Sequence, residues 1–338
     1  MLKQCALLLF FISLFICSCG NDFSPVSQDQ SQNPVAISDD TQTESETNEP
    51  QANETEPDPQ VTPTPPPSQN SLLVDAPTGI WVWKNVEEII QAEKRETFFD
   101  ELSFYSKAEN ISLFLNINTE KISDDSFYQE NIASFLEAAH ARGIQVHALG
   151  SATEWIDNPE NAIAKFVVPT LEFDFDGLHF DVEAHLHPSW NEEDNEELLQ
   201  NFLALAQQVK EASAEQAVYW DIPSWYFKDS AKVMVEGISI GKLIVEENIF
   251  PVLMSYRDTA QEIENFSQAA LEYLVEQNRD WFFAVETSSA ESEDITYAGE
   301  CLEHLVDDIN TLFDHYQKGT AIHNWTTLQE LELCEAEE

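Results

Sequence analysis

Residues 175–187 read FDGLHFDVEAHLH, and apolar and polar side chains alternate along most of this stretch. Successive residues of a β-strand point to opposite faces, so one face is apolar and the other carries His179, Asp181 and Glu183. On a solvated edge strand these polar groups would meet only water. In a closed barrel they would point inward, where ionised groups are costly unless they are paired or used in chemistry.

The rest of the chain favours the barrel. Eight runs rich in β-branched and aromatic residues predict strands, and amphipathic segments such as 129–143, 195–213 and 267–278 predict helices between them. The predicted strands are 79–83, 111–117, 144–149, 177–183, 217–222, 250–256, 281–286 and 320–325. This alternation predicts α/β architecture with a parallel sheet, and eight units close a single (β/α)8 TIM barrel over residues 75–338. An open doubly wound sheet is the alternative, but no GxGxxG follows the first strand.

The N-terminus predicts export. Lys3 precedes an apolar run that ends in Ile16-Cys17-Ser18-Cys19, and this tetrapeptide resembles the bacterial lipobox. The resemblance implies that residues 1–18 are a signal peptide and that the acylated Cys19 anchors the chain to a lipid bilayer. Gly20 rather than Asp follows, which by resemblance to Gram-negative lipoproteins favours the outer membrane of the cell envelope. An uncleaved anchor helix is the alternative.

Residues 19–74 predict a disordered tether, because they are rich in Pro, Thr, Glu and Gln and almost lack large apolar residues. The formal net charge of the whole chain is −48, which argues against nucleic acid as a partner. Cys301 and Cys334 remain in the mature chain, and they either form a disulfide or stay free. No cysteine or histidine spacing predicts a zinc site, and no cofactor is expected.

Three places in the predicted barrel resemble the chitinase-like glycoside hydrolases. Residues 176–183, DGLHFDVE, resemble that family's fourth-strand signature, Asp-Gly-x-Asp-x-Asp-x-Glu. Residues 254–258, MSYRD, are similar to its Met-x-Tyr-Asp, with Arg257 inserted. The eighth predicted strand ends in Trp325, where the family often has a tryptophan forming the floor of the sugar subsite.

The resemblance implies a role for each matching residue. Glu183 would be the general acid that protonates the glycosidic oxygen. Asp181 would hold the acetamido group of the substrate, whose oxygen attacks the anomeric carbon, and Tyr256 would hydrogen-bond the same group. Burial and a like charge two residues away should keep such an acid protonated. His179 departs from the pattern, because the family has an aspartate there. A cationic His179 would pair with Asp181 and keep it ionised, and His179 is also a candidate substrate contact.

Glu286 offers a second catalytic arrangement. It ends the seventh predicted strand, and a glutamate there paired with Glu183 would match retaining glycosidases, whose carboxyl groups lie about 5–5.5 Å apart. That group usually has Asn before its fourth-strand glutamate, whereas Val182 stands here. The alternative is a structural glutamate bonded to Thr287, Ser288 or Ser289.

Other residues at predicted strand ends suggest a carbohydrate cleft. Asp221 is the last but one residue of the fifth predicted strand and is a candidate substrate contact. Tryptophans stack on sugar rings but are also common in cores; those at or after strand ends are Trp81, Trp83, Trp155, Trp220, Trp225 and Trp325. Lys84 and Arg257 would either receive an anionic group of the substrate or neutralise acids at the mouth.

These observations favour a lipid-anchored glycoside hydrolase-like protein that acts on envelope or external polysaccharide, including peptidoglycan-type glycans. One alternative is a non-catalytic glycan-binding barrel. Another is a metal-dependent hydrolase whose ligands come from the fourth strand and its neighbours; the residues concerned are His147, His179, Asp181, Glu183, His185, His187, Asp221 and His323.

Overall fold

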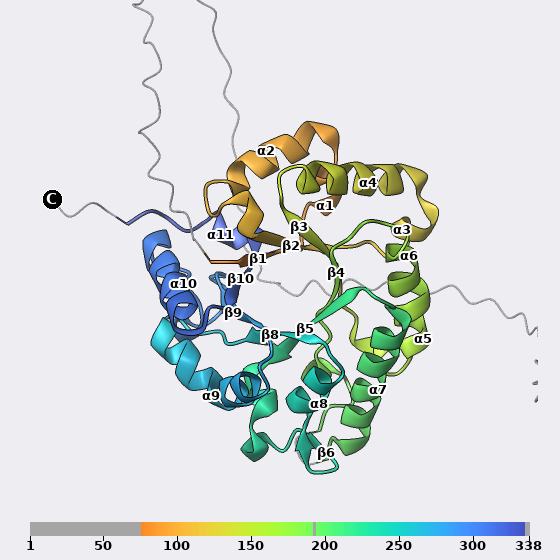
Figure 1. Cartoon of the computed structure of the whole chain (residues 1–338), viewed down its shortest axis with the longest axis vertical. Helices are drawn as coiled ribbons and strands as arrows, with labels where there is room; N and C mark the ends of the chain where they lie inside the picture. The colour runs from red at the N-terminus through yellow and green to blue at the C-terminus, as the bar shows by residue number, and fades with distance from the viewer. Residues whose placement is uncertain (1–75, 192–193, 335–338) are drawn as a thin grey trace, which may run out of the picture. The chain divides into compact units, whose positions relative to one another are not determined.

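The computed structural model describes residues 76–191 and 194–334. Within them, eight parallel strands form a closed barrel, which confirms the predicted (β/α)8 fold (Figure 1). In ring order the strands are β1 (Thr78–Val82), β2 (Ile111–Asn116), β3 (Gln145–Gly150), β4 (Gly177–Phe180), β5 (Ala217–Pro223), β8 (Phe250–Met254), β9 (Phe282–Glu286) and β10 (Gly319–His323). The predicted signal peptide, the acylated Cys19 and the predicted tether lie outside the described residues.

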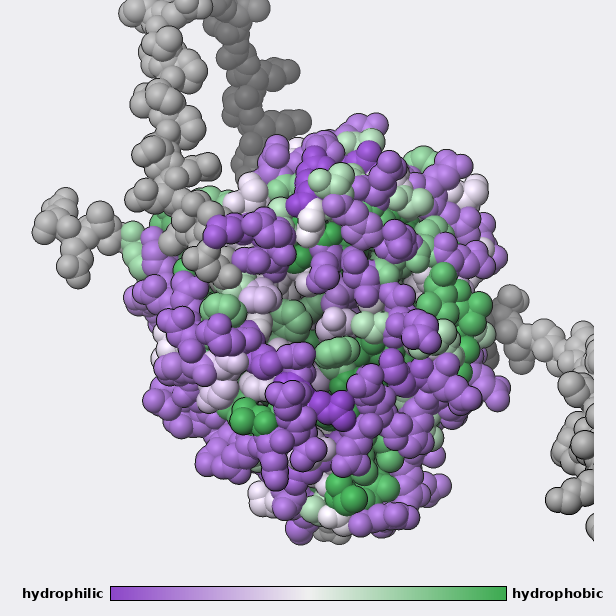
Figure 2. All heavy atoms as spheres, viewed as in Figure 1, coloured by the Kyte–Doolittle hydropathy of each residue, from purple (hydrophilic) through white to green (hydrophobic). Residues whose placement is uncertain are grey.

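Helices surround the strands on all sides of the ring (Figure 1). The helices are α1 (Val86–Ile89), α2 (Ala92–Leu102), α3 (Lys121–Asp124), α4 (Ser126–His140), α5 (Pro159–Ala162), α6 (Val168–Thr170), α7 (Glu196–Ala212), α8 (Ile240–Glu246), α9 (Ala260–Glu276), α10 (Leu302–Tyr316) and α11 (Trp325–Leu328). A small hairpin of β6 (Met234–Val235) and β7 (Ile238–Ser239) precedes α8. Hydrophilic residues predominate on the face drawn in Figure 2. None of the helices in the described ranges is both long and apolar enough to cross a bilayer.

Strand alternation divides the buried apolar residues into two cores. The barrel interior contains Trp81, Phe114, Leu149, Val252, Ala284 and Ala321. The larger core lies between the strands and the helices, and it takes the alternate residues, such as Ile80, Phe180 and Trp220. Gly79 makes the interior packing possible, because a Cβ atom there would lie 2.6 Å from Cζ of Phe114.

Strand β4 is shorter than the sequence predicts. Its ladder stops at Phe180, but the amide of Asp181 still donates to the carbonyl of Gly150. The indole of Trp220 then donates to the carbonyl of Val182 at 3.0 Å. Glu183 keeps extended dihedrals (φ −112°, ψ 113°), so the alternation continues to Glu183 although regular pairing has ended.

A disulfide joins Cys301 to Cys334, which decides between the two alternatives left by the sequence. The bond ties the start of α10 to the C-terminal segment. Two hydrogen bonds join the same segments: the amide of Leu302 donates to the carbonyl of Glu332, and the amide of Cys334 donates to Glu303.

We expect replacement of both cysteines by serine to lower the free energy of unfolding by about 2–4 kcal/mol, because a closed loop of this size restricts the unfolded chain. Urea denaturation of the wild type and of the double variant measures the loss. The control is a reductant, which should destabilise the wild type and leave the double variant unchanged. Equal stability of the two proteins without reductant would contradict the prediction.

Candidate active site

The inward residues of β4 and its neighbours surround a cavity of about 480 Å³ at the carboxyl ends of the strands. Asp181 and Glu183 line it, whereas His179 lies deeper and is fully buried. The complete lining is Trp81, Trp83, Lys84, Asp181, Glu183, Asp221, Met254, Tyr256, Glu286, Glu291, His323 and Asn324. We call this the mouth cavity. It contains the predicted catalytic residues Asp181, Glu183, Tyr256 and Glu286 together.

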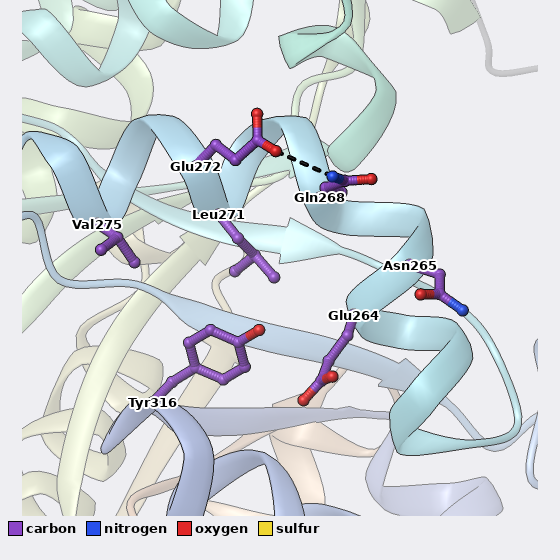
Figure 3. A pocket seen from close by; sticks show the side chains of 7 residues that line it. All are labelled: Glu264, Asn265, Gln268, Leu271, Glu272, Val275 and Tyr316. Carbon is purple, nitrogen blue, oxygen red and sulfur yellow. Dashed lines mark hydrogen bonds between the residues drawn. The ribbon is translucent and has the colours of Figure 1, made fainter.

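The surface has other hollows of similar size without this chemistry. One of about 440 Å³ lies along α9 beside Tyr316 of α10, and its labelled side chains are shown in Figure 3. Its carboxylate Glu264 contacts His315 at 2.6 Å. The hollow gathers no group of acids comparable to that of the mouth cavity, so we place the candidate active site in the barrel.

Burial governs the protonation of the two β4 acids. It raises the pKa of Asp181, and the like charge of Asp221 raises it further, whereas His323 acts in the opposite direction. Burial also raises the pKa of Glu183, with further contributions from Asp181 and Asp221. A carboxyl group that keeps its proton near neutral pH can serve as a general acid. The causes are those that the sequence predicts for paired acids on one face of a strand.

His179 pairs with Asp221, not with Asp181. Its Nε2 lies 2.7 Å from Oδ1 of Asp221, and the indole of Trp81 donates to Oδ2 of the same carboxyl group at 3.2 Å. Complete burial lowers the pKa of His179 to about 3, so the imidazole is neutral. The expectation of a cationic histidine that keeps Asp181 ionised is therefore wrong. His179 also lines neither the mouth cavity nor the hollow beside it, so we do not retain it as a direct substrate contact.

Glu286 is held by protein donors on both oxygens. Oε1 accepts from the amides of Thr287 (2.9 Å) and Ser288 (2.7 Å), and Oε2 lies 2.6 Å from Nδ1 of His323. The opposite nitrogen of His323 accepts from the indole of Trp83 at 2.9 Å. This arrangement favours the structural alternative for Glu286 over the role of nucleophile.

The proton of His323 can be placed from these contacts. Burial lowers its pKa, but the hydrogen bond and charge of Glu286 and the charges of Asp181 and Asp221 outweigh burial and raise it. An indole N–H only donates, so Nε2 of His323 must carry a lone pair. In this geometry Nδ1–H of His323 donates to Glu286, and a second proton, which the raised pKa favours, would have to displace the Trp83 indole from Nε2.

Tyr256 lines the mouth cavity next to Glu183. Burial raises its pKa, and the surrounding carboxylates raise it further, so its hydroxyl keeps its proton and can donate a hydrogen bond. Met254, two residues earlier on the same inward face, lines the same cavity. The sequence interpretation names Met254 in the motif at residues 254–258 but gives it no role in the site, although the strand alternation that identifies Tyr256 also applies to it.

A second hollow of about 240 Å³ adjoins the mouth cavity, and Glu183, Met254 and Tyr256 line both. We call it the side pocket. It is completed by His185, Pro223, Trp225, Arg257, Phe266 and Ile295. Two predicted substrate-binding residues, Trp225 and Arg257, therefore lie beside Glu183 but outside the mouth cavity.

The other predicted cleft tryptophans divide between the cavity and the core. Trp81 and Trp83 line the mouth cavity. Trp155 packs on Phe166, and Trp220 stacks on Phe180, both in the outer core. Trp325 is 6% exposed and packs against Phe98 and Tyr105 in the same core, because α11 begins at this residue. The prediction that Trp325 forms the floor of a sugar subsite is therefore wrong.

Four of the residues proposed for a metal centre are engaged in pairwise contacts. His179 pairs with Asp221, His187 with Asp157, and His185 with Tyr226. Within residues 76–191 and 194–334, the one cluster whose ligand atoms lie close enough for an ion is Cys301, His304 and Cys334. The disulfide occupies two of these three residues. The geometry thus does not favour the metal alternative.

Comparisons with solved structures agree with the fold. A GH18 chitinase from Pseudoalteromonas aurantia is 11% identical, with 75% of this chain and 98% of that chain covered and a TM-score of 0.50. A chitinase from Bacteroides thetaiotaomicron is 13% identical, with 74% and 89% covered and a TM-score of 0.47. No protein-family model matches the sequence, and no curated protein matches it. The chain therefore shares the TIM-barrel fold of the Pseudoalteromonas aurantia chitinase.

The folded protein favours the protonated form of Glu183. We therefore expect Glu183 to stabilise the folded state below the ordinary carboxyl pKa, and this stabilisation to be lost as the pH rises through the raised pKa of Glu183. Glu183→Gln should therefore lose less free energy of unfolding than the wild type between about pH 5 and about pH 9. Urea denaturation across this range measures the difference. Glu137→Gln, at an exposed position on α4, is the matched control and should follow the wild type. Parallel curves for wild type and Glu183→Gln would contradict the assignment.

Proposed function

We propose that this protein is a glycoside hydrolase that cleaves polysaccharide containing N-acetylated sugars, with Glu183 as general acid. The observation that carries the proposal is the placement of Glu183, whose pKa burial raises, in a cavity at the carboxyl ends of the barrel strands. The chitinase-like fold supports it. We further propose that Cys19 anchors the protein to the bacterial envelope.

The chemistry follows from the arrangement of the acids. Glu183 donates its proton to the glycosidic oxygen as the bond to the anomeric carbon breaks. The acetamido oxygen of the same sugar attacks that carbon, in the substrate-assisted manner known for some glycosidases. Asp181 and the hydroxyl of Tyr256 lie in the same cavity and would orient the acetamido group. Water then opens the intermediate, and the Glu183 carboxylate takes its proton.

Among the described residues, no protein donor is hydrogen-bonded to the side chain of Asp181 or Glu183, whereas Asp221 and Glu286 each have two or more partners. Of these four acids, Asp181 and Glu183 are thus the two whose side chains are available to a substrate. Asp221 would act as a positioning residue that raises the pKa of Glu183, and Trp81 would present an aromatic surface below the sugar.

Glu183→Gln should reduce hydrolysis of N-acetylglucosamine oligosaccharides by about 100-fold or more, as expected for the loss of a general acid. Product release measured by chromatography tests this, with Glu137→Gln as the control. Turnover that survives in Glu183→Gln would refute the assignment. If the wild type binds these glycans and releases no product from any of them, the non-catalytic alternative is correct.

The rate should fall as the pH rises through the pKa of Glu183, because the general acid must be protonated. Asp221→Asn removes a like charge that raises this pKa, so the alkaline limb of kcat should move to lower pH. A pH profile of kcat for both proteins measures the shift. An unmoved alkaline limb in Asp221→Asn would show that Asp221 does not tune Glu183.

A further inference from the structure

We infer that the side pocket is a subsite for a sugar that carries a carboxylate, and that Arg257 and His185 recognise that group. This inference rests on the proposed function, because it places the subsite on the leaving-group side of Glu183. Glu183 lines both cavities, so a glycan cleaved beside it would occupy both. Asp181 and Trp81 lie only in the mouth cavity, which would receive the acetamido sugar.

Arg257 is held in a fixed position, and the one carboxylate of the described residues on which its charge is seen to act, that of the exposed Asp294, does not form an ion pair with it. Its guanidinium lies 3.9 Å from the ring centre of Phe266, and its Nη1 donates to the carbonyl of Tyr256. Arg95 and Arg142 each reach Glu96, whereas Arg257 forms no ion pair within 4.0 Å among the described residues. A planar guanidinium fixed on an aromatic ring keeps free N–H groups in the fork geometry that matches a carboxylate.

The lack of an ion pair separates two explanations for Arg257. If it served to neutralise acids of the mouth, one of them should lie in contact with it. Asp181, Glu183 and Glu286 all line the mouth cavity, yet no ion pair links any of them to Arg257. A half-buried guanidinium that contacts none of the mouth acids and lines a cavity beside Glu183 is instead placed to bind an external anion.

His185 supplies a second donor in the side pocket. The hydroxyl of Tyr226 accepts from the backbone N–H of His185 at 3.0 Å, and it lies 3.1 Å from Nδ1 of the same residue. The hydroxyl proton is free to donate to Nδ1, which places the imidazole proton on Nε2. Nε2 lies 3.6 Å from Oε2 of Glu183, too far for a good hydrogen bond, so its N–H is available to a ligand.

The side pocket also has an apolar wall for a sugar ring. Trp225 and Met254 line it, and the ring of His185 packs edge-on against Trp225 at 5.4 Å. Flat aromatic surfaces beside fixed polar donors are typical of small-molecule sites. A carboxylate on the sugar would come from a lactyl ether, as in peptidoglycan-type strands, or from a uronic acid. Both present the same planar anion.

The test is a binding experiment with Glu183→Gln in the full-length chain, which prevents turnover. The probes are a neutral N-acetylglucosamine oligomer, a peptide-free strand with lactyl carboxylates on alternate sugars, the same strand with these carboxylates converted to amides, and an oligomer with alternating uronic acid. Calorimetry gives the dissociation constants. We expect a carboxylate probe to bind about 10-fold or more tightly than the amide strand. Whether the lactyl or the uronate probe binds better identifies the source.

When Arg257→Gln is combined with Glu183→Gln, the preference for carboxylate strands over amide strands should disappear, whereas binding of the neutral oligomer should not weaken. Arg257→Lys should retain part of the preference, because it keeps the charge and loses the fork. Arg279→Gln is the matched control: Arg279 is half-buried like Arg257 and lies outside both cavities, with a hydrogen bond to Asn248. Thermal unfolding of each variant shows that it is folded.

The outcomes separate this inference from the proposed function. Equal binding of carboxylate and amide strands, or a preference that survives Arg257→Gln, overturns the subsite alone. A carboxylate preference that depends on Arg257, in a protein whose wild type releases no product, supports the subsite and removes the catalytic role. Failure of every glycan to bind overturns both.

Discussion

The two-residue period of β4 is the constraint on which the rest of this structure depends. A closed barrel sends every second residue inward, and on this strand those residues are His179, Asp181 and Glu183. The interior disfavours charge on all of them, so the pKa of the histidine falls to about 3 and the pKa values of both acids rise. The alternation of inward and outward residues thus places these three side chains where their neutral forms are favoured, although the chain as a whole is strongly acidic.

Two tryptophans of β1 and the segment that follows it stabilise the polar groups that surround these acids. Trp81 donates to Asp221, and Trp83 donates to His323, which in turn contacts Glu286. An indole N–H buried beside an acceptor satisfies both partners without adding charge. These hydrogen bonds use the side-chain oxygens of Asp221 and Glu286, whereas the side chains of Asp181 and Glu183 remain available to a substrate.

The sequence predicts the fold well because the barrel depends on local patterns. All eight strands overlap their predicted ranges, since the β-branched and aromatic runs and the helical spacing between them each reflect a nearby burial requirement. The orientation of Asp181 and Glu183 follows from the same alternation. The pairing of His179 with Asp221 could not be predicted from this alternation. The contact joins side chains of two strands, and which side chains lie level with each other depends on the register of the barrel.

Tryptophan placement shows a second limit of the sequence. Trp81 lies within the first predicted strand and Trp325 ends the eighth, and both have the apolar surface that suits a sugar. Trp81 occupies an inward position of β1, whereas the chain turns into α11 at Trp325, where an Asn324 cap starts the helix. At a strand end the chain can turn into a helix, so that a side chain there packs outside the barrel. The amino-acid type alone does not tell which side chains do so.

The overall charge of the protein does not decide what the site can bind. Screening reduces interactions between exposed charges over about 8 Å at physiological ionic strength, so most helix carboxylates have little effect on a ligand in the barrel mouth. The groups that matter are those in contact. Burial favours the protonated, neutral forms of Asp181 and Glu183, whereas Arg257 brings a guanidinium to the side pocket. A strongly acidic surface is therefore compatible with a local preference for an anionic sugar, because burial suppresses the negative charges nearest the ligand and leaves the positive one.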